Sequence, residues 1–397
     1  MTSKPSFISL FSGCGGLDAG FIESGFTCKQ AFDIDKKVIE IHRMNLGPSG
    51  VVADLREITK EQLIKHGVPP VVVAGSPCQG FSTAGKRELH DPRNSLLLQA
   101  GRLAIQVKPK VFIAENVVGA LSGEHKVYWE TLEHMLRSAG YSTVTLKLNA
   151  SELGLAQLRS RLIMLAWTGA REPKLDMTPV RNKTLIDVLD QIDGLPQHDK
   201  KFLIPGSPHF AISSRIDRGQ KLCNVRGGAA SVHTWEIPEV FGKTTQPEKL
   251  LLQTTMKLRR TERLRAFGDA DPVSMDSLQR EVGSRAPALV ESLLKKGYLR
   301  ALDGRFDLAN TFNGKYRRLD WNSVSLTVDT RFGDPRYFLH PSEHRSFTVR
   351  EAARIQGFPD WFKFPGRSVD SFKMIGNAVP PPMAKYVANV VRGLLHR

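Results

Sequence analysis

The sequence predicts an α/β protein with a mainly parallel sheet, helices on both faces of that sheet, and a smaller module inserted late in the chain. Over the first 170 residues, short apolar runs alternate with helix-length segments, and this regularity stops after Trp167. Strands separated by helices are typical of βαβ units. A chain of 397 residues, 41% of them hydrophobic, is long enough for two domains.

The predicted elements follow one another in a regular order. Strands are predicted at residues 7–11, 30–34, 51–52, 71–74, 111–114, 141–148 and 162–167. Helices are predicted at residues 15–24, 36–45, 59–66, 95–107, 348–356 and 382–395. We expect the closing helix to return to the first domain. The predicted domains are therefore residues 1–170, an insert at 171–325, and a returning segment at 326–397.

The charge balance and the cysteines narrow the class of protein. Lys and Arg number 56 against 40 Asp and Glu, a formal net charge of +16, which favours a nucleic-acid partner over an ordinary basic enzyme. The four cysteines (Cys14, Cys28, Cys78 and Cys223) show neither metal-site spacing nor a disulfide framework. With no long apolar run, we expect a cytoplasmic protein that does not contact a membrane.

A cysteine lies at the end of a predicted buried strand. Residues 75–82 (Gly-Ser-Pro-Cys-Gln-Gly-Phe-Ser) directly follow the apolar run 71–74, so Cys78 is placed at the edge where open α/β sheets keep their ligands. A proline beside it stiffens the backbone, as suits a nucleophile. The alternative is a small buried residue without reactivity, because free cysteines are usually buried and inert.

Glycines and acids at successive strand ends suggest a nucleoside-containing cofactor. Residues 11–16 (Phe-Ser-Gly-Cys-Gly-Gly) join the first strand to the first helix, although they do not form the G-x-G-x-x-G fingerprint. Asp33 and Asp54 end the next two strands, where they can accept hydrogen bonds from a ribose and from an adenine amino group. Taken singly, each is more typical of a helix cap or a turn.

Three further charged residues lie at the ends of predicted strands. Glu115 follows the strand at 111–114, and Arg159 and Arg161 alternate where a later strand begins. Neighbouring parallel strands would bring Glu115 onto the same rim as Cys78. The alternatives are a solvated loop acid and a solvated strand edge.

The chain resembles DNA (cytosine-5)-methyltransferases of bacterial restriction-modification systems, and six ordered motifs carry the resemblance. They lie at residues 11–16, 75–79, 115–117, 157–161, 350–359 and 376–381. The resemblance implies a Rossmann-like S-adenosylmethionine-dependent methyltransferase fold, with a target-recognition domain in the insert.

The resemblance also implies the catalytic residues. A Cys78 thiolate would attack C6 of cytosine, which makes C5 nucleophilic toward the methyl group of S-adenosylmethionine. Glu115 would hold N3 and the exocyclic amino group, Arg161 would contact the base carbonyl oxygen, and Arg159 would support this network. Elimination of Cys78 would release 5-methylcytosine, and the family uses no metal.

The cofactor contacts implied by the resemblance come from every part of the first domain and from the end of the chain. They are Phe11, Gly13, Cys14, Gly15, Gly16, Asp33, Ile34, Asp54, Leu55, Pro77, Leu96, Asn377 and Ala378. Two positions depart from the family pattern: Ile34 stands where a tryptophan is usual, and Ala156 replaces a usual proline. The first departure puts cofactor affinity in doubt.

The implied partner is double-stranded DNA, whose target base must be flipped out of the helix to be reached. Residues 79–93 match the family's mobile loop over that base. Its implied DNA contacts are Gln79, Ser82, Lys86, Arg87 and Arg93. We expect a monomer that acts in the bacterial cytoplasm on nucleoid DNA, with a cognate restriction endonuclease acting separately.

Residues 171–325 occupy the place of the target-recognition domain, where the resemblance lapses. A helix predicted at 258–267 would let Arg259, Arg260, Arg263 and Arg265 follow phosphates. Two further helices, at 275–282 and 286–296, precede a hairpin signalled by Asp303-Gly304. This order is similar to a winged helix-turn-helix, with Arg285 and Lys295 on the groove-facing helix and Arg305 in the wing.

Three other classes of protein remain open at this point. A tRNA cytosine-5 methyltransferase is disfavoured because that branch has a shorter middle region. A DNA-binding regulator that has lost catalysis is disfavoured because Cys78, Glu115 and both arginines are present. A nicotinamide-dependent oxidoreductase is disfavoured because the dinucleotide fingerprint is missing.

Overall fold

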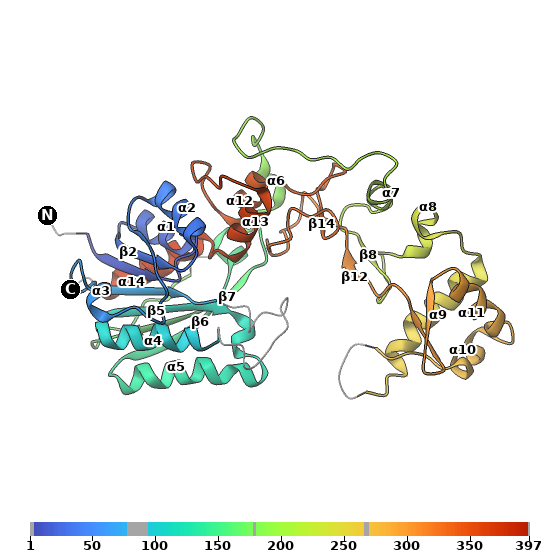
Figure 1. Cartoon of the computed structure of the whole chain (residues 1–397), viewed down its shortest axis with the longest axis horizontal. Coiled ribbons are helices and arrows are strands. Elements are labelled where there is room, and N and C mark those ends of the chain that lie inside the picture. Colours follow the sequence, from blue (N-terminus) through green and yellow to red (C-terminus); the bar gives the residue numbers. More distant parts are fainter. Residues whose placement is uncertain (1–3, 78–93, 178–179, 266–269, 396–397) are drawn as a thin grey trace. The chain divides into compact units, whose positions relative to one another are not determined.

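The computed structural model describes residues 4–77, 94–177, 180–265 and 270–395. Two compact units divide the chain (Figure 1). The sheet unit comprises Met1–Asp199, Asn322–Arg331 and Thr348–Arg397. The insert unit comprises Lys200–Trp321 and Phe332–Phe347. The insert was predicted at residues 171–325. The insert unit instead begins at Lys200 and ends at Phe347, and residues 322–331 within this range belong to the sheet unit.

A seven-stranded sheet in the order β3-β2-β1-β4-β5-β7-β6 forms the centre of the sheet unit. Its strands are β1 (Ser6–Leu10), β2 (Thr27–Asp33), β3 (Gly50–Val52), β4 (Val71–Gly75), β5 (Val111–Val117), β6 (Ser142–Asn149) and β7 (Ser160–Trp167). β7 pairs antiparallel with both of its neighbours, and the other pairings are parallel. The predicted fold class is confirmed.

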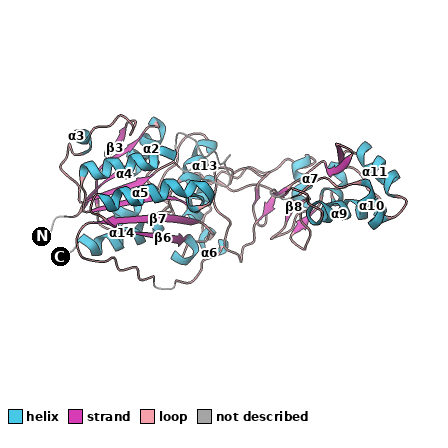
Figure 2. Ribbon diagram, turned by 90° about the horizontal axis from the view of Figure 1, so that it is seen from below, coloured by secondary structure: helices cyan, strands magenta, loops and turns pink. Residues whose placement is uncertain are grey.

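Helices cover both faces of this sheet (Figures 1 and 2). The helices of the sheet unit are α1 (Gly16–Glu23), α2 (Lys36–Leu46), α3 (Lys60–Leu63), α4 (Ser95–Val107), α5 (Lys126–Ser138), α6 (Leu185–Leu189), α12 (Val349–Gln356), α13 (Ser368–Asn377) and α14 (Pro381–Leu395). Short 3₁₀ turns lie at Val118–Leu121, Gly123–His125 and Ala150–Leu153. The helix predicted at 59–66 is only the single turn α3, because Gly67 and two prolines follow it closely.

Strand alternation divides the core into two layers. On one face, Val72, Ala74 and Phe112 pack with residues of α4 and α5. On the other face, Val71 and Val73 pack with residues of α1 and α14. Successive strand residues point to opposite faces, so a strand buried on both sides reads as a continuous apolar run. The closing helix therefore completes the core of the sheet unit.

The insert unit contains a helical lobe and a small β-region. The lobe consists of α9 (Gln246–Thr261), α10 (Met275–Val282), α11 (Ala286–Lys295) and a hairpin of β10 (Leu299–Leu302) with β11 (Arg305–Leu308). The remaining elements are α7 (Pro208–Ser214), α8 (Pro238–Phe241), a 3₁₀ turn at Thr234–Glu236, β8 (Lys221–Cys223), β9 (Ser231–Val232), β12 (Asn313–Lys315), β13 (Arg317–Arg318) and β14 (Phe338–Leu339). Of these, β12, β8 and β9 form one sheet.

The predicted helices and hairpin of the lobe are present. The hairpin joins Leu302 to Arg305 through two residues, and both Asp303 and Gly304 have positive φ, as a tight hairpin turn requires. The helix predicted at 258–267 is wrong in its bounds: α9 begins at Gln246, where Thr245 forms a capping box with Glu248, and it ends at Thr261. Arg263 and Arg265 therefore lie beyond the helix.

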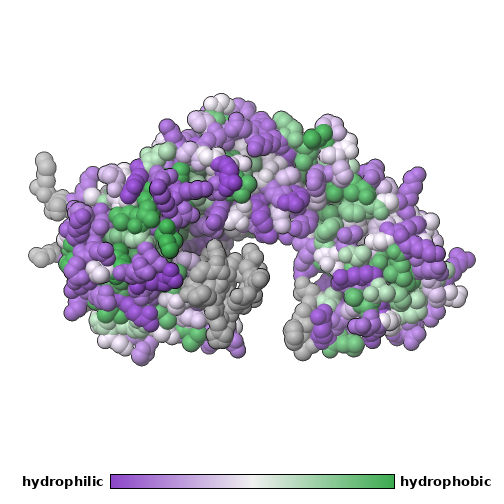
Figure 3. Space-filling model, in the orientation of Figure 1, coloured by the Kyte–Doolittle hydropathy of each residue, from purple (hydrophilic) through white to green (hydrophobic). Residues whose placement is uncertain are grey.

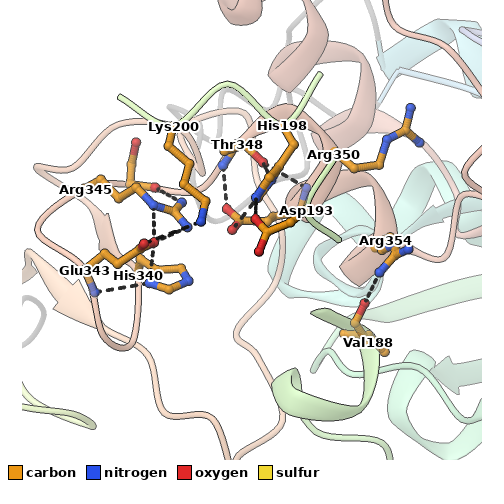
Figure 4. Close-up of polar contacts among 12 residues, drawn as sticks. Val188, Asp193, His198, Lys200, His340, Glu343, Arg345, Thr348, Arg350 and Arg354 are labelled. Carbon is orange, nitrogen blue, oxygen red and sulfur yellow. Dashed lines mark hydrogen bonds and ion pairs between the residues drawn. The ribbon is translucent and has the colours of Figure 1, made fainter. Parts of the chain in front are cut away.

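Polar clusters hold the segments around the unit boundaries (Figure 4). Within the sheet unit, His198 contacts the Thr348 hydroxyl at 3.0 Å, and Thr348 caps α12. Within the insert unit, Arg345 pairs with Glu343 at 2.5 Å. Hydrophilic residues cover most of the face drawn in Figure 3. In the part of the chain that the structure describes, every helix is too short or too polar to cross a bilayer.

Candidate active site

A cavity of about 490 Å³ opens at the carboxyl ends of the strands in the sheet unit. Its wall begins with the loop between β1 and α1, continues with residues after β2, β3 and β4, and includes the carboxyl end of β5. Helix α13, near the end of the chain, forms the remaining side. This position and size are typical of ligand sites in open α/β sheets.

Most of the residues predicted to bind a cofactor lie together in this wall. They are Phe11, Gly13, Cys14, Gly16, Asp33, Ile34, Asp54, Leu55, Pro77, Leu96, Asn377 and Ala378. Gly15 is the predicted residue that does not line the cavity. Its φ of 97° suits glycine, and a Cβ there would lie 2.4 Å from the Leu46 side chain. Gly15 therefore shapes the loop.

The glycine loop is fixed from two sides. The Gly13 amide donates to the Asp33 carboxylate at 3.0 Å, which ties the loop to the end of β2. Burial raises the pKa of Asp33, although amide donors, including that of Gly13, lower it. Beneath the loop, the fully buried His42 and Asp18 side chains contact each other at 2.8 Å. Burial also raises the pKa of the Cys14 thiol to about 12, so this thiol stays protonated at neutral pH.

The far end of the cavity combines an acid and an apolar residue. Asp54 is held by two hydrogen bonds of 3.0 Å from the Arg56 guanidinium, which lowers the pKa of that carboxyl. Ile34 is 63% exposed, an unusual exposure for a large apolar side chain, and it lines the cavity. An apolar surface is thus open to a ligand beside a carboxyl whose pKa Arg56 lowers.

The other end carries a buried ion pair. Glu115 and Arg161 contact each other at 2.9 Å, and their side chains are 9% and 12% exposed. Burial raises the pKa of the Glu115 carboxyl, although Arg161 and Arg159 lower it. Glu115 was predicted to follow its strand, and the structure corrects this: it lies within β5, opposite Gly75 of β4.

Arg159 is completely buried and does not line the cavity. Its guanidinium donates to the carbonyl oxygens of Val328, Gly376 and Ala378 at 3.0, 2.9 and 2.8 Å. These contacts fasten the start of β7 to the segment after α13. Arg159 thus positions the wall that carries Asn377 and Ala378.

Sequence reasoning missed one side of the cavity. Asp370, Lys373, Met374 and Asn377 line it together from α13. Their spacing of three and four residues places them on one helical face, and this spacing was a usable signal. Only Asn377 was predicted, because the helix at 368–377 was not recognised.

Several predicted residues lie outside the described part of the chain. They are Cys78, Gln79, Ser82, Lys86, Arg87 and Arg93. The described strand-end segment before them ends at Pro77, which lines the cavity. Ser76, one residue earlier, accepts a hydrogen bond of 3.1 Å from Asn116 of β5.

The arginines predicted to contact DNA in the insert unit differ in their surroundings. Arg259 is 7% exposed and pairs with the buried carboxylate of Asp307. Arg260, Arg263 and Arg285 are exposed. Lys295 is exposed and pairs with Glu291 at 2.9 Å on the same helix.

Comparisons with known proteins identify the family of this chain. A family model described as C-5 cytosine-specific DNA methylase matches residues 5–392. The Type II methyltransferase M.HgiBI of Herpetosiphon aurantiacus is 30% identical over 95% of this chain and 94% of its own. The Type II methyltransferase M.XorII of Xanthomonas oryzae pv. oryzae is 29% identical over 100% of this chain and 86% of its own.

Solved structures share the fold. A putative DNA modification methyltransferase encoded within an Escherichia coli prophage superposes with a TM-score of 0.61, at 24% identity over 99% of this chain and 100% of that one. The Dnmt2 methyltransferase of Schizosaccharomyces pombe gives a TM-score of 0.53 at 15% identity, with 99% of each chain covered. Because the family model spans nearly the whole sequence, this chain belongs to the C-5 cytosine-specific DNA methylase family and is a DNA cytosine-5 methyltransferase.

Proposed function

We propose that the enzyme transfers a methyl group from S-adenosylmethionine to C5 of a cytosine flipped out of a specific double-stranded DNA sequence. One observation carries the proposal: the Glu115–Arg161 pair lines the same cavity as the glycine loop and the strand-end acids. The Glu115–Arg161 pair, which could bind the polar edge of a pyrimidine, thus lies beside the glycine loop, Asp33 and Asp54, which are suited to bind a nucleoside.

The residues present fit S-adenosylmethionine. A Cβ at Gly13, with φ of 55°, would meet nothing within 4 Å, so the loop leaves room for a ligand against its backbone. Asp33 would accept from the ribose hydroxyls, and Asp54 from the adenine amino group. The exposed side chain of Ile34 offers an apolar surface to adenine. When bound, the cofactor supplies an electrophilic methyl group.

The chain's own residues would make the base reactive. The Cys78 thiolate forms a bond to C6, the C5–C6 double bond opens, and C5 becomes the nucleophile. Glu115 in its protonated form donates to N3, which withdraws electrons from the ring as sulfur attacks. After methyl transfer, loss of the C5 proton and of the Cys78 sulfur restores the ring. Arg161 would hold the base carbonyl oxygen.

This role has a definite pH dependence. Burial raises the pKa of Glu115, so more of its carboxyl is protonated near neutral pH than for an ordinary glutamate. Activity that depends on this proton is present below the raised pKa and falls as pH rises through it. We expect kcat/KM for DNA to decline on the alkaline side with a limb that disappears in Glu115→Gln.

Parallel transfer assays test the proposal. The purified enzyme and labelled S-adenosylmethionine are incubated with unmethylated duplex DNA and with tRNA, and bisulfite sequencing then maps the modified cytosines. Label in DNA at one sequence word supports the proposal, whereas label confined to tRNA contradicts it. Cys78→Ala abolishes both transfer and covalent capture on 5-fluorocytosine DNA. Cys28→Ala is the matched control, since Cys28 does not line the cavity.

The named relatives also support a cellular role. M.HgiBI and M.XorII are called Type II methyltransferases. We infer that this enzyme protects host DNA in the cytoplasm against a separate restriction endonuclease of the same specificity. Protection is tested by challenging plasmid from expressing cells with endonucleases that cut at the mapped word.

A further inference from the structure

The insert unit holds a second cavity whose charge is of one sign. It has a volume of about 930 Å³ and lies between α9, the loop after β8 and the segment leading into β12. Five basic residues line it, and no Asp or Glu is among its described lining residues. The basic residues are Arg226, Lys257, Arg259, Arg260 and Arg263.

These cations come from separate parts of the chain. Arg226 follows β8, whereas Lys257 and Arg260 stand on the last turns of α9. Cations at the C-terminal end of a helix are favourable without any ligand, which accounts for two of them. It does not account for Arg226. Among the described residues, Arg226, Lys257 and Arg260 have exposed side chains and no ion-pair partner.

The base of this cavity is held rigidly. Arg259 pairs with Asp307 of β11, and Asp307 also pairs with Arg300 of β10 at 2.7 Å. The Nη1 atom of Arg259 is buried and has no hydrogen-bond partner among the described residues. Arg259 thus forms a fixed base for the cavity, which Arg226, Lys257 and Arg260 line as exposed cations, and clustered exposed cations are suited to bind phosphate oxygens.

We propose that this cavity binds the phosphodiester backbone of duplex DNA and so anchors the helical lobe on the substrate. The inference rests on the proposed function, because DNA is the polyanion that the enzyme must hold. It gives the anchoring role to the end of α9 rather than to α11. The exposed positions of α11 include Ala288, Glu291 and Lys295, and the last two neutralise each other.

Binding of a fluorescein-labelled duplex of arbitrary sequence, measured by anisotropy over a range of salt concentrations, tests the proposal in the full-length protein. The variant Arg226→Gln/Lys257→Gln/Arg260→Gln is expected to bind at least about 10-fold more weakly, with a shallower dependence of log K on log salt, by about 0.9 for each lost phosphate contact. The control Lys201→Gln/Lys243→Gln/Lys249→Gln removes the same charge from the insert unit outside the cavity.

An equal loss in both variants, or no loss in the first, overturns the proposal. The proposal is also overturned if the protein binds inorganic phosphate in this cavity but the two variants bind duplex DNA with equal affinity. Unchanged melting temperatures confirm that both variants fold. If wild-type enzyme transfers no methyl group to DNA but the two variants still differ in duplex binding, the proposed function fails and the anchoring site stands. If transfer occurs and the KM for DNA is unaffected in the cavity variant, the anchoring site alone fails.

Discussion

The two units use buried charge differently. In the sheet unit, the Glu115–Arg161 pair lines an open cavity, so each partner has a side available to a ligand. In the insert unit, Glu248–Lys296 joins α9 to the end of α11, and neither residue lines one of the two cavities described above. The two pairs therefore differ in what lies next to them, because only the first borders a cavity. Removing charge should damage catalysis in one unit and folding in the other.

Glu115→Gln is the largest expected effect and tests the first half of this contrast. The amide keeps the shape but cannot give up a proton to N3, so kcat should fall by about 10²- to 10⁴-fold. The rate of labelled methyl transfer to saturating DNA, measured from samples quenched at successive times, gives this loss of kcat. An unchanged melting temperature confirms that the fold is intact, and retained kcat would contradict the proposed role.

Glu248→Gln tests the second half. Burial raises the pKa of Glu248, but hydrogen bonds from Lys296 and Ser292 outweigh this and lower it to about 2. The depressed value corresponds to a stabilisation of about 3 kcal/mol, fully present above the ordinary glutamate pKa near 4.5 and lost as pH falls toward 2. The Glu248→Gln variant should lose this stabilisation, and the stability of its lobe should no longer fall between pH 4.5 and 2 through this group.

Hydrogen exchange of the α9 and α11 amides measures this change within the full-length protein. Glu291→Gln is the matched control, because its partner Lys295 is exposed and an exposed pair contributes about 0–1 kcal/mol. Equal protection in Glu248→Gln and wild type would show that the pair does not hold the lobe.

Asp33→Asn probes a site where folding and binding overlap. The carboxylate holds the Gly13 amide and is proposed to accept from the cofactor ribose. Losing one charged acceptor should weaken S-adenosylmethionine binding about 10- to 100-fold, since hydrogen bonds to charged groups contribute about 1.5–3 kcal/mol. Calorimetric titration measures the affinity, with Glu23→Gln on the outer face of α1 as the control. Equal affinities would remove Asp33 from the site.

Gly304→Ala should give the smallest effect and concerns the hairpin alone. Gly304 has φ of 74°, where a Cβ is strained although nothing obstructs it within 4 Å. The lobe should lose about 1 kcal/mol. Thermal unfolding followed by circular dichroism measures the loss, and catalysis at low temperature should be preserved. A stabilised variant would contradict the assigned turn.

Most strands of the sheet unit could be predicted from the sequence, because they are buried on both faces. Runs such as Val71–Ala74 are apolar throughout and end in glycine, so each strand was predicted within a few residues. Helix α13 was not, because it follows Pro365-Gly366 and ends in a turn that contains Gly376, all of which indicate irregular structure.

The site was predictable where motifs carry it and unpredictable where contacts are made across long separations in sequence. The strand-end positions of Asp33 and Asp54 follow from local order. The hydrogen bonds that Arg159 donates to the carbonyl oxygens of Val328 and Ala378 could not be predicted, because these residues lie more than 160 positions away in the sequence. The same holds in the insert unit, where no signal in the sequence indicated that Arg259 pairs with Asp307, 48 residues later.

Helix α14 carries a consequence for how the enzyme is made. Met383, Val387 and Val391 bury in one cluster with Phe7 and Phe21, so the first strand and helix have no complete partner until α14 emerges from the ribosome. The nascent insert is finished earlier. A chain that terminates near residue 380 should therefore fold its helical lobe but leave an apolar face of the sheet exposed. We expect this product to aggregate or to be degraded rather than to retain partial activity.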